Sequence, residues 1–121
     1  MFHRHEEDAD HHSFHHGLPV RGLLPVLVLS IIKDKPTHGG EIYQGLKDKF
    51  DINAPRPVIY ILLRRLEKAG LMVSSWDIQE SGPARRNYTI TEDGIEVFNF
   101  GVEKLKKVSK IINTLTDETG T

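Results

Sequence analysis

The chain has 121 residues, of which 38% are hydrophobic and 27% charged, and its formal net charge is −1 at pH 7. This length suits one domain with one core. The longest apolar run, residues 23–32, is too short to span a bilayer. The histidine-rich, acidic N-terminus is unlike a signal or transit peptide. The absence of cysteine excludes disulfides and thiol chemistry. We therefore expect a cytoplasmic protein without a membrane segment or a cofactor.

Positive charge is concentrated in residues 56–86, although the whole chain is nearly neutral. This stretch holds six basic residues against three acidic ones, whereas residues 91–121 hold six acidic residues against four lysines. A basic region on one part of a domain is the electrostatic footprint of a nucleic-acid partner. The distribution of charge therefore indicates a binding surface that the net charge conceals.

The first 20 residues are polar, lack apolar periodicity and contain six of the seven histidines. We expect a flexible arm. His11 and His15 are spaced four residues apart, as are His12 and His16. On a helix each pair would share a face and bind Zn(II), Ni(II) or Cu(II). A solvated arm without a physiological metal is the alternative interpretation.

Apolar periodicity predicts three helices before residue 70. The first, residues 23–33, is apolar nearly all round and is expected to be buried. The second begins at residue 37 or 38 and ends near residue 50, with one apolar face. The third begins at Pro57 and ends before Gly70, a natural C-terminal cap. Its polar face carries three basic side chains, Arg64, Arg65 and Lys68.

Two strands are predicted at residues 71–78 and 86–90, joined by a turn that includes Gly82 and Pro83. Arg85 and Arg86 lie at the far side of this turn. A basic helix followed at once by a basic hairpin is the layout of a winged helix-turn-helix. We therefore expect a mainly α fold with a small β-hairpin wing, in the order helix, helix, helix, strand, strand, helix.

A long last helix is expected to begin after Thr91, whose hydroxyl is followed by two acidic residues. It would span roughly 24 residues, about 36 Å. We expect its wide apolar stripe to pack, together with the first helix, against a second copy; folding back on its own domain is the alternative. The predicted dimer interface consists of Leu24, Val28, Ile95, Phe98, Val102, Leu105 and Ile112. The predicted organisation is an arm at 1–20, a winged-helix domain at 21–90, a dimerisation helix at 91–116 and a tail at 117–121.

Four motifs resemble the signature of PadR-type transcriptional regulators, in the usual order and at the usual spacing. They are HGGEI from His38, IYILLRRLEKAGL from Ile59, ESGPARRNY from Glu80 and TEDG from Thr91. The resemblance implies a winged helix-turn-helix repressor that dimerises through its terminal helices. It is similar to the short subgroup with one C-terminal helix, some members of which bind planar aromatic or drug-like molecules between the subunits.

Two positions depart from the pattern of the family that this chain resembles. The family usually has Gly-Thr where this chain has Pro57 and Val58, which removes a hydroxyl and a backbone N–H that can donate to a phosphate. Gly40 stands where the family has a tyrosine. The first departure shifts the expected DNA contacts to other side chains.

The predicted DNA contacts are Arg56, Tyr60, Arg64, Arg65, Arg85 and Arg86. For each, a solvated or packing role is the alternative. His38 is interpreted as structural, at the start of the second helix. Trp76 is expected to pack in the core or the hairpin rather than to bind a ligand. No glycine-rich phosphate loop and no nucleophile motif is present, so we expect no enzyme.

We therefore predict a sequence-specific, homodimeric DNA-binding regulator, a repressor by resemblance, with a pseudo-palindromic operator whose half-sites lie about 10 bp apart. One alternative is a sensor of the same fold whose effector releases DNA, the effector being a planar aromatic molecule or a metal at the arm. Another is a protein-interaction module that uses this fold without DNA.

Overall fold

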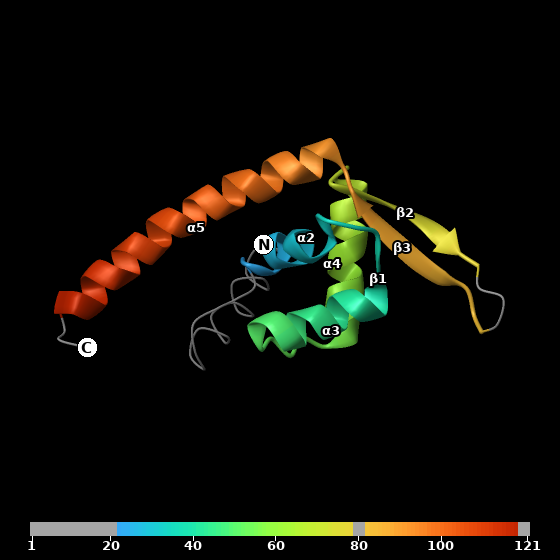
Figure 1. Cartoon of the computed structure of the whole chain (residues 1–121), viewed down its shortest axis with the longest axis horizontal. Coiled ribbons are helices and arrows are strands. Elements are labelled where there is room, and N and C mark those ends of the chain that lie inside the picture. The colour runs from blue at the N-terminus through green and yellow to red at the C-terminus, as the bar shows by residue number, and fades with distance from the viewer. Residues whose placement is uncertain (1–21, 79–81, 119–121) are drawn as a thin grey trace, which may run out of the picture.

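A computed structural model of the chain describes residues 22–78 and 82–118 (Figure 1). The described residues form four α-helices and a three-stranded antiparallel sheet. In chain order the elements are α2 (Leu24–Ile32), β1 (Thr37–His38), α3 (Gly39–Phe50), α4 (Arg56–Lys68), β2 (Met72–Asp77), β3 (Arg85–Ile90) and α5 (Glu92–Glu118). The predicted mainly α fold with a small wing is confirmed.

Some sequence predictions lie outside the described residues. They include the arm at residues 1–20 with its candidate metal ligands His11, His12, His15 and His16, part of the turn before Gly82, and the last three residues. Within the described part, α5 ends at Glu118, two residues beyond the predicted boundary. No helix in that part combines the length and the apolar character needed to cross a membrane.

The sheet has the strand order β1-β3-β2, and β1 was not predicted. β1 has two residues, Thr37 opposite Tyr88 and His38 opposite Asn87. A two-residue strand is too short to produce an alternating pattern, and it exists because β3 lies beside it. As a consequence α3 begins at Gly39, directly after the strand.

The core is formed by the apolar faces of α2, α3 and α4 together with the first residues of the hairpin. Its buried members are Leu24, Val28, Leu29, Ile32, Ile42, Leu46, Ile59, Leu63, Leu66, Met72 and Tyr88. Burying such side chains is the main favourable term in folding, roughly 25 cal/mol per Å² of apolar surface. This core fixes α4 against the hairpin, so both elements of the predicted DNA surface rest on it.

The C-terminal end of α4 follows the cap predicted at Gly70. The backbone of Gly70 is left-handed, with φ of 82°. The N–H of Leu71 donates to the carbonyl of Leu66 across 3.0 Å. This hydrogen bond is typical of a helix that ends on glycine. The chain therefore turns sharply into β2.

Thr91 joins the end of α4 to the start of α5. Its hydroxyl donates to the carbonyl of Gly70 across 2.7 Å and accepts the N–H of Gly94 across 3.0 Å. Its own N–H donates to the carbonyl of Leu71 across 3.1 Å. The predicted cap is confirmed, and it also links three segments of the fold.

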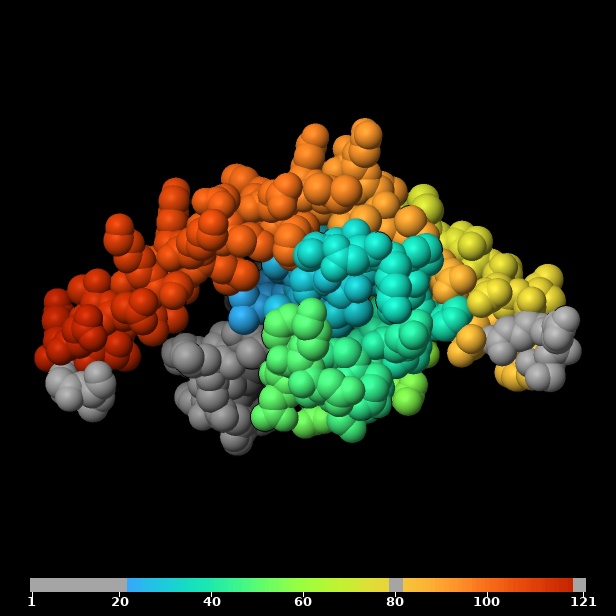
Figure 2. Space-filling model, viewed as in Figure 1, coloured from blue at the N-terminus to red at the C-terminus, as the bar shows by residue number. Residues whose placement is uncertain are grey.

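α5 lies over α2 in its first half and extends past the other helices in its second half (Figure 1, Figure 2). The two helices approach closely at Gly101, where a Cβ atom would lie 2.8 Å from Cγ2 of Val26. Every residue from 106 to 118 is exposed. Within the described part of the chain, α5 therefore packs on α2 in its first half, whereas its C-terminal half is exposed.

Two residues predicted at the dimer interface are already buried within a single chain. Leu24 is 6% exposed and Val28 is 0% exposed, both in the core of a single chain. They belong to the same buried apolar cluster as residues of α3, α4 and the hairpin. Phe98 also packs against this core, and Val102 and Leu105 are half-buried.

Substituting Gly94 by alanine should destabilise the protein by about 1–3 kcal/mol, the usual effect of overpacking. The added Cβ would overlap the backbone carbonyl oxygen of Leu71, which cannot move without breaking the Thr91 junction. The measurement is urea unfolding of both proteins. Gly40→Ala is the control, because no atom lies within 4 Å of its Cβ position. Equal stability of Gly94→Ala and wild type would contradict the packing described.

Candidate nucleic-acid interface

α4 has one buried and one exposed face, as expected for a helix that presents side chains to a partner. Ile59 and Leu63 are buried, whereas Tyr60, Arg64 and Arg65 are exposed. Ile61, on the exposed side, has 46% of its surface accessible. An α-helix with its side chains is about 10–12 Å across, which matches the width of a DNA major groove. The exposed face of α4 therefore has the size and the charge of a groove-binding helix.

Arg56 is the first residue of α4 and is held against α3. Its guanidinium carbon lies 4.2 Å from the centroid of the Tyr43 ring. Such cation–π stacking restricts a long side chain while leaving its N–H groups exposed. Arg56 therefore places a positive charge at the entrance of α4, next to Pro57, which has no N–H to offer.

Tyr60 packs over the start of α3. A Cβ atom at Gly39 would lie 3.0 Å from Cε1 of Tyr60, so glycine there allows the ring to approach the backbone. Tyr60 is nevertheless 41% exposed. It lines a hollow of about 360 Å³ between the start of α3 and the wing. The other residues of this hollow are His38, Gly39, Gly40, Ala84, Arg85, Arg86 and Tyr88.

Tyr88 also lines this hollow and is 6% exposed. Burial raises the pKa of the Tyr88 phenol. The positive charges of Arg86 and Arg64 act in the opposite direction, whereas Glu67 and Tyr60 add to the increase. Tyr60 from α4 and Arg86 from the wing line the same hollow as Tyr88, and Arg64 lies one turn after Tyr60 on α4.

Arg86 is held by both neighbouring elements. Its Nε donates to Oγ of Ser74 across 2.9 Å, and the Ser74 hydroxyl donates to Oε2 of Glu67 on α4 across 2.6 Å. The guanidinium carbon also lies 4.9 Å from the centroid of the Trp76 ring. Trp76 was expected to pack in the core or in the hairpin. It packs in the hairpin, and at 61% exposure it does not belong to the core.

His38 has the structural position predicted for it. It is the N-cap of α3, and its backbone N–H donates to Oε1 of Glu41 across 3.1 Å. Its Nε2 lies 3.7 Å from Oδ2 of Asp77, so the side chain reaches across β3 to β2. These contacts connect the start of α3 to the wing.

The predicted DNA contacts fall into three places. Tyr60, Arg85 and Arg86 line one hollow, and Arg64 lies one turn after Tyr60 on α4. Arg56 stands two turns before Arg64, on the Tyr43 ring. Arg65 is exposed, one helical step of about 100° round from Arg64.

Sequence reasoning missed four residues of this surface, namely Glu67, Ser74, Trp76 as a partner of Arg86, and Tyr88. The available signal was the hairpin register, which pairs Trp76 with Arg86 and Ser74 with Tyr88. In an antiparallel hairpin, directly paired residues share a face, so the register alone would have placed these side chains together.

Comparisons with known proteins agree with this geometry. The model of the transcriptional regulator PadR-like family matches residues 28–99. A search of curated proteins found no match. A PadR family transcriptional regulator from Eggerthella lenta is similar to this chain, with 27% identity, a TM-score of 0.72 and coverage of 93% of this chain and 95% of that one.

Two further solved structures are similar. A PadR-like transcriptional regulator from Bacillus cereus is 28% identical, with a TM-score of 0.71 and coverage of 79% of this chain and 93% of that one. PadR from Bacillus subtilis, solved in complex with operator DNA, is 22% identical, with a TM-score of 0.62 and coverage of 69% of this chain and 48% of that one. At 22% identity, the similarity to the Bacillus subtilis protein shows the fold alone.

The buried phenol makes stability depend on alkaline pH. Because the pKa of Tyr88 is raised in the folded state, its phenol stays protonated to a higher pH in the folded than in the unfolded state. Stability should therefore be constant, as far as Tyr88 contributes, below the unfolded pKa of about 10 and fall as pH rises through the folded pKa. Urea unfolding between pH 8 and 11.5 measures this, and Tyr88→Phe should show a smaller decrease. An unchanged decrease in the variant would contradict the assignment.

Proposed function

Since this chain belongs to the PadR-like family of transcriptional regulators, we propose that it is a repressor that binds a specific operator DNA as a homodimer. The observation that carries this proposal is the grouping of Tyr60 on α4 with Arg85 and Arg86 on the wing, around one hollow. The operator complex of the Bacillus subtilis relative supports it.

In this proposal α4 enters the major groove and the wing follows the flanking backbone. Tyr60 and Arg64 reach base edges or phosphates from the exposed face of α4. Ile61, beside them, offers an apolar contact for a thymine methyl group. Arg56 supplies the charge for a phosphate near the helix entrance, where Pro57 has no N–H. Arg85 and Arg86 contact the backbone or the minor groove, where the potential favours arginine.

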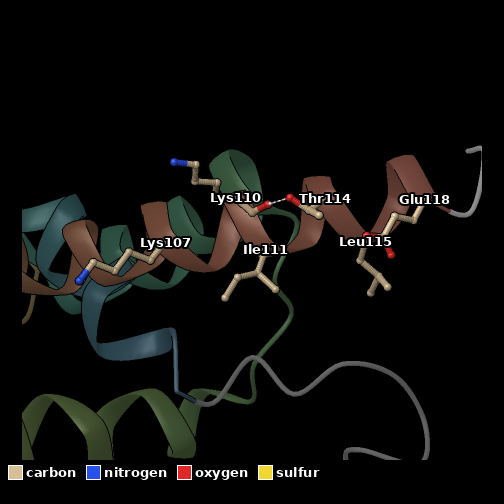
Figure 3. A pocket seen from close by; sticks show the side chains of 6 residues that line it. All are labelled: Lys107, Lys110, Ile111, Thr114, Leu115 and Glu118. Carbon is tan, nitrogen blue, oxygen red and sulfur yellow. Dashed lines mark hydrogen bonds between the residues drawn. The ribbon is translucent and has the colours of Figure 1, made fainter.

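The proposed homodimer is formed through the exposed half of α5. Val108, Ile111, Ile112 and Leu115 are all between 46% and 66% exposed, and they lie in the part of α5, residues 106–118, in which every residue is exposed. Figure 3 shows Ile111 and Leu115 projecting from one side of α5 and Lys110 from the other. An uncovered apolar stripe of this length indicates a protein partner. Because an isologous pair is two-fold symmetric, its operator would be pseudo-palindromic with half-sites about 10 bp apart.

A sensor function is a second candidate, and the surface of α5 favours it. A hollow of about 540 Å³ lies along Lys107, Ile111 and Leu115. This volume is in the range of small-molecule sites, but the lining comes from one helix, so only a second copy would close it. A planar aromatic molecule bound there would change the spacing of the two α4 helices and release DNA. Titration of the protein–DNA complex with planar aromatic compounds, and separately with Zn(II) or Ni(II), tests this candidate and the proposed metal response of the arm.

Replacing Arg64 and Arg65 together by alanine should abolish specific binding to a duplex from the chain's own upstream region. Each base-edge contact contributes about 1–3 kcal/mol, and the loss of two charges should also reduce the dependence of log K on log salt by about two. Gel shifts and fluorescence anisotropy at several salt concentrations provide the measurement. Lys33→Ala, an exposed charge at the end of α2, is the control. Normal binding by the double variant would rule out α4 as the recognition helix. A wild-type protein without salt-dependent DNA affinity would favour a protein-interaction module.

Introducing a charge into the exposed stripe should separate the dimer without unfolding the chain. Ile111→Asp and Leu115→Asp, made singly, should sediment as monomers and bind the operator at least tenfold more weakly, because the two half-sites are then bound independently. Asn113→Asp is the matched control, since it adds the same charge to the other side of α5. Sedimentation equilibrium measures the association. If the apolar variants remain dimeric, the interface lies elsewhere.

A further inference from the structure

Arg86 is constrained more tightly than an exposed arginine usually is. Ser74 from β2 accepts a hydrogen bond from its Nε, Trp76 from β2 stacks on its guanidinium, and Glu67 from α4 orients the Ser74 hydroxyl. Three side chains from two elements, β2 and α4, therefore determine the position of Arg86. A surface arginine loses much rotational freedom on binding, and a side chain held in place beforehand loses less.

The hairpin register explains why these groups meet. Ser74 is paired with Tyr88 and Trp76 with Arg86, so all four side chains share the face of the hairpin that packs on α4. Tyr88 is buried, whereas Trp76, in the next pair on the same face of the hairpin, is 61% exposed. Trp76 therefore lies just beyond the edge of the core. The outer part of the hairpin extends away from α4 (Figure 1).

Arg86 remains exposed despite these contacts. Among the described residues, Nε is the Arg86 nitrogen that takes part in a hydrogen bond, to Ser74. A guanidinium presents its N–H groups as a fork that fits a phosphate. The large apolar ring beside it is mostly accessible, and tryptophan is seldom left accessible without packing against something.

We propose that Trp76 and Ser74 are positioning residues that hold Arg86 for a backbone phosphate, and that Trp76 itself lies against the adjacent deoxyribose of bound DNA. This inference rests on the proposed function. It assigns to the wing a preformed phosphate-and-sugar contact, in which the arginine meets the charge and the indole covers the apolar face of the sugar.

The single tryptophan of the chain allows a direct test. The experiment measures acrylamide quenching of its fluorescence in the free protein and in the complex with a duplex from the chain's own upstream region. The quenching constant should fall at least twofold on binding, because the sugar covers the ring, whereas a scrambled duplex at the same salt concentration should have a smaller effect. An unchanged quenching constant, under conditions where anisotropy shows saturated binding, would refute the contact.

Variants test the positioning role. Trp76→Ala should weaken binding about two- to fivefold, the range expected for one exposed cation–π contact, and Trp76→Phe should restore most of the affinity. Ser74→Ala should weaken binding similarly. Ser75→Ala is the matched control, because it is the neighbouring serine on the opposite face of β2. Thermal unfolding checks that each variant is folded.

A double-mutant cycle separates positioning from independent effects. Arg86→Ala should reduce affinity about tenfold and the salt dependence of log K by about one. Adding Trp76→Ala to it should weaken binding by less than the product of the two single effects, since the ring then has no arginine to hold. Fully multiplicative effects, or wild-type binding by Trp76→Ala and Ser74→Ala, would overturn the inference while leaving the proposed function intact. A wild-type protein that binds no DNA would overturn both.

Discussion

The junction at Thr91 is the constraint on which the functional surfaces depend. Through three hydrogen bonds of 2.7–3.1 Å, Thr91 connects the carbonyls of Gly70 and Leu71, at the end of α4, to the N–H of Gly94 in α5. Gly94 must lack a side chain because Leu71 lies directly against it. The direction of α5 relative to α4 is therefore determined locally. Since α4 carries the candidate DNA contacts and α5 the exposed stripe, this junction would set how far apart two copies hold their recognition helices.

The second organising contact joins α4 to the wing. Apolar packing of Leu63 and Leu66 against the hairpin supplies the stability, and the hydrogen bonds from Arg86 through Ser74 to Glu67 supply the alignment. A chain with a net charge of −1 can in this way present a local positive surface. Such a surface needs no excess of basic residues overall, because screening limits each charge to its own neighbourhood, about 8–10 Å at physiological salt.

Local patterns predicted the elements well because their causes are local. The helices begin and end within one or two residues of their predicted limits, and the caps at Gly70 and Thr91 are present as expected. The strand β1 was missed because two residues carry no periodicity of their own. Leu24 and Val28 were assigned to a dimer interface because apolar periodicity identifies a buried face without identifying what buries it.

By itself, the sequence determined the order of the elements, the amphipathic character of α4 and the location of the basic residues near the wing, since each follows from neighbours a few positions apart. Tertiary structure decided which of those residues meet. Residues 74 and 76 reach Arg86 only through the strand register, and residue 67 reaches it only because α4 packs on that face. It also decided which part of α5 is exposed. α5 packs on α2 near Gly101 and Val26, and its residues from 106 onward are exposed. Contacts between distant segments depend on how all the apolar faces are buried together, which no local pattern encodes.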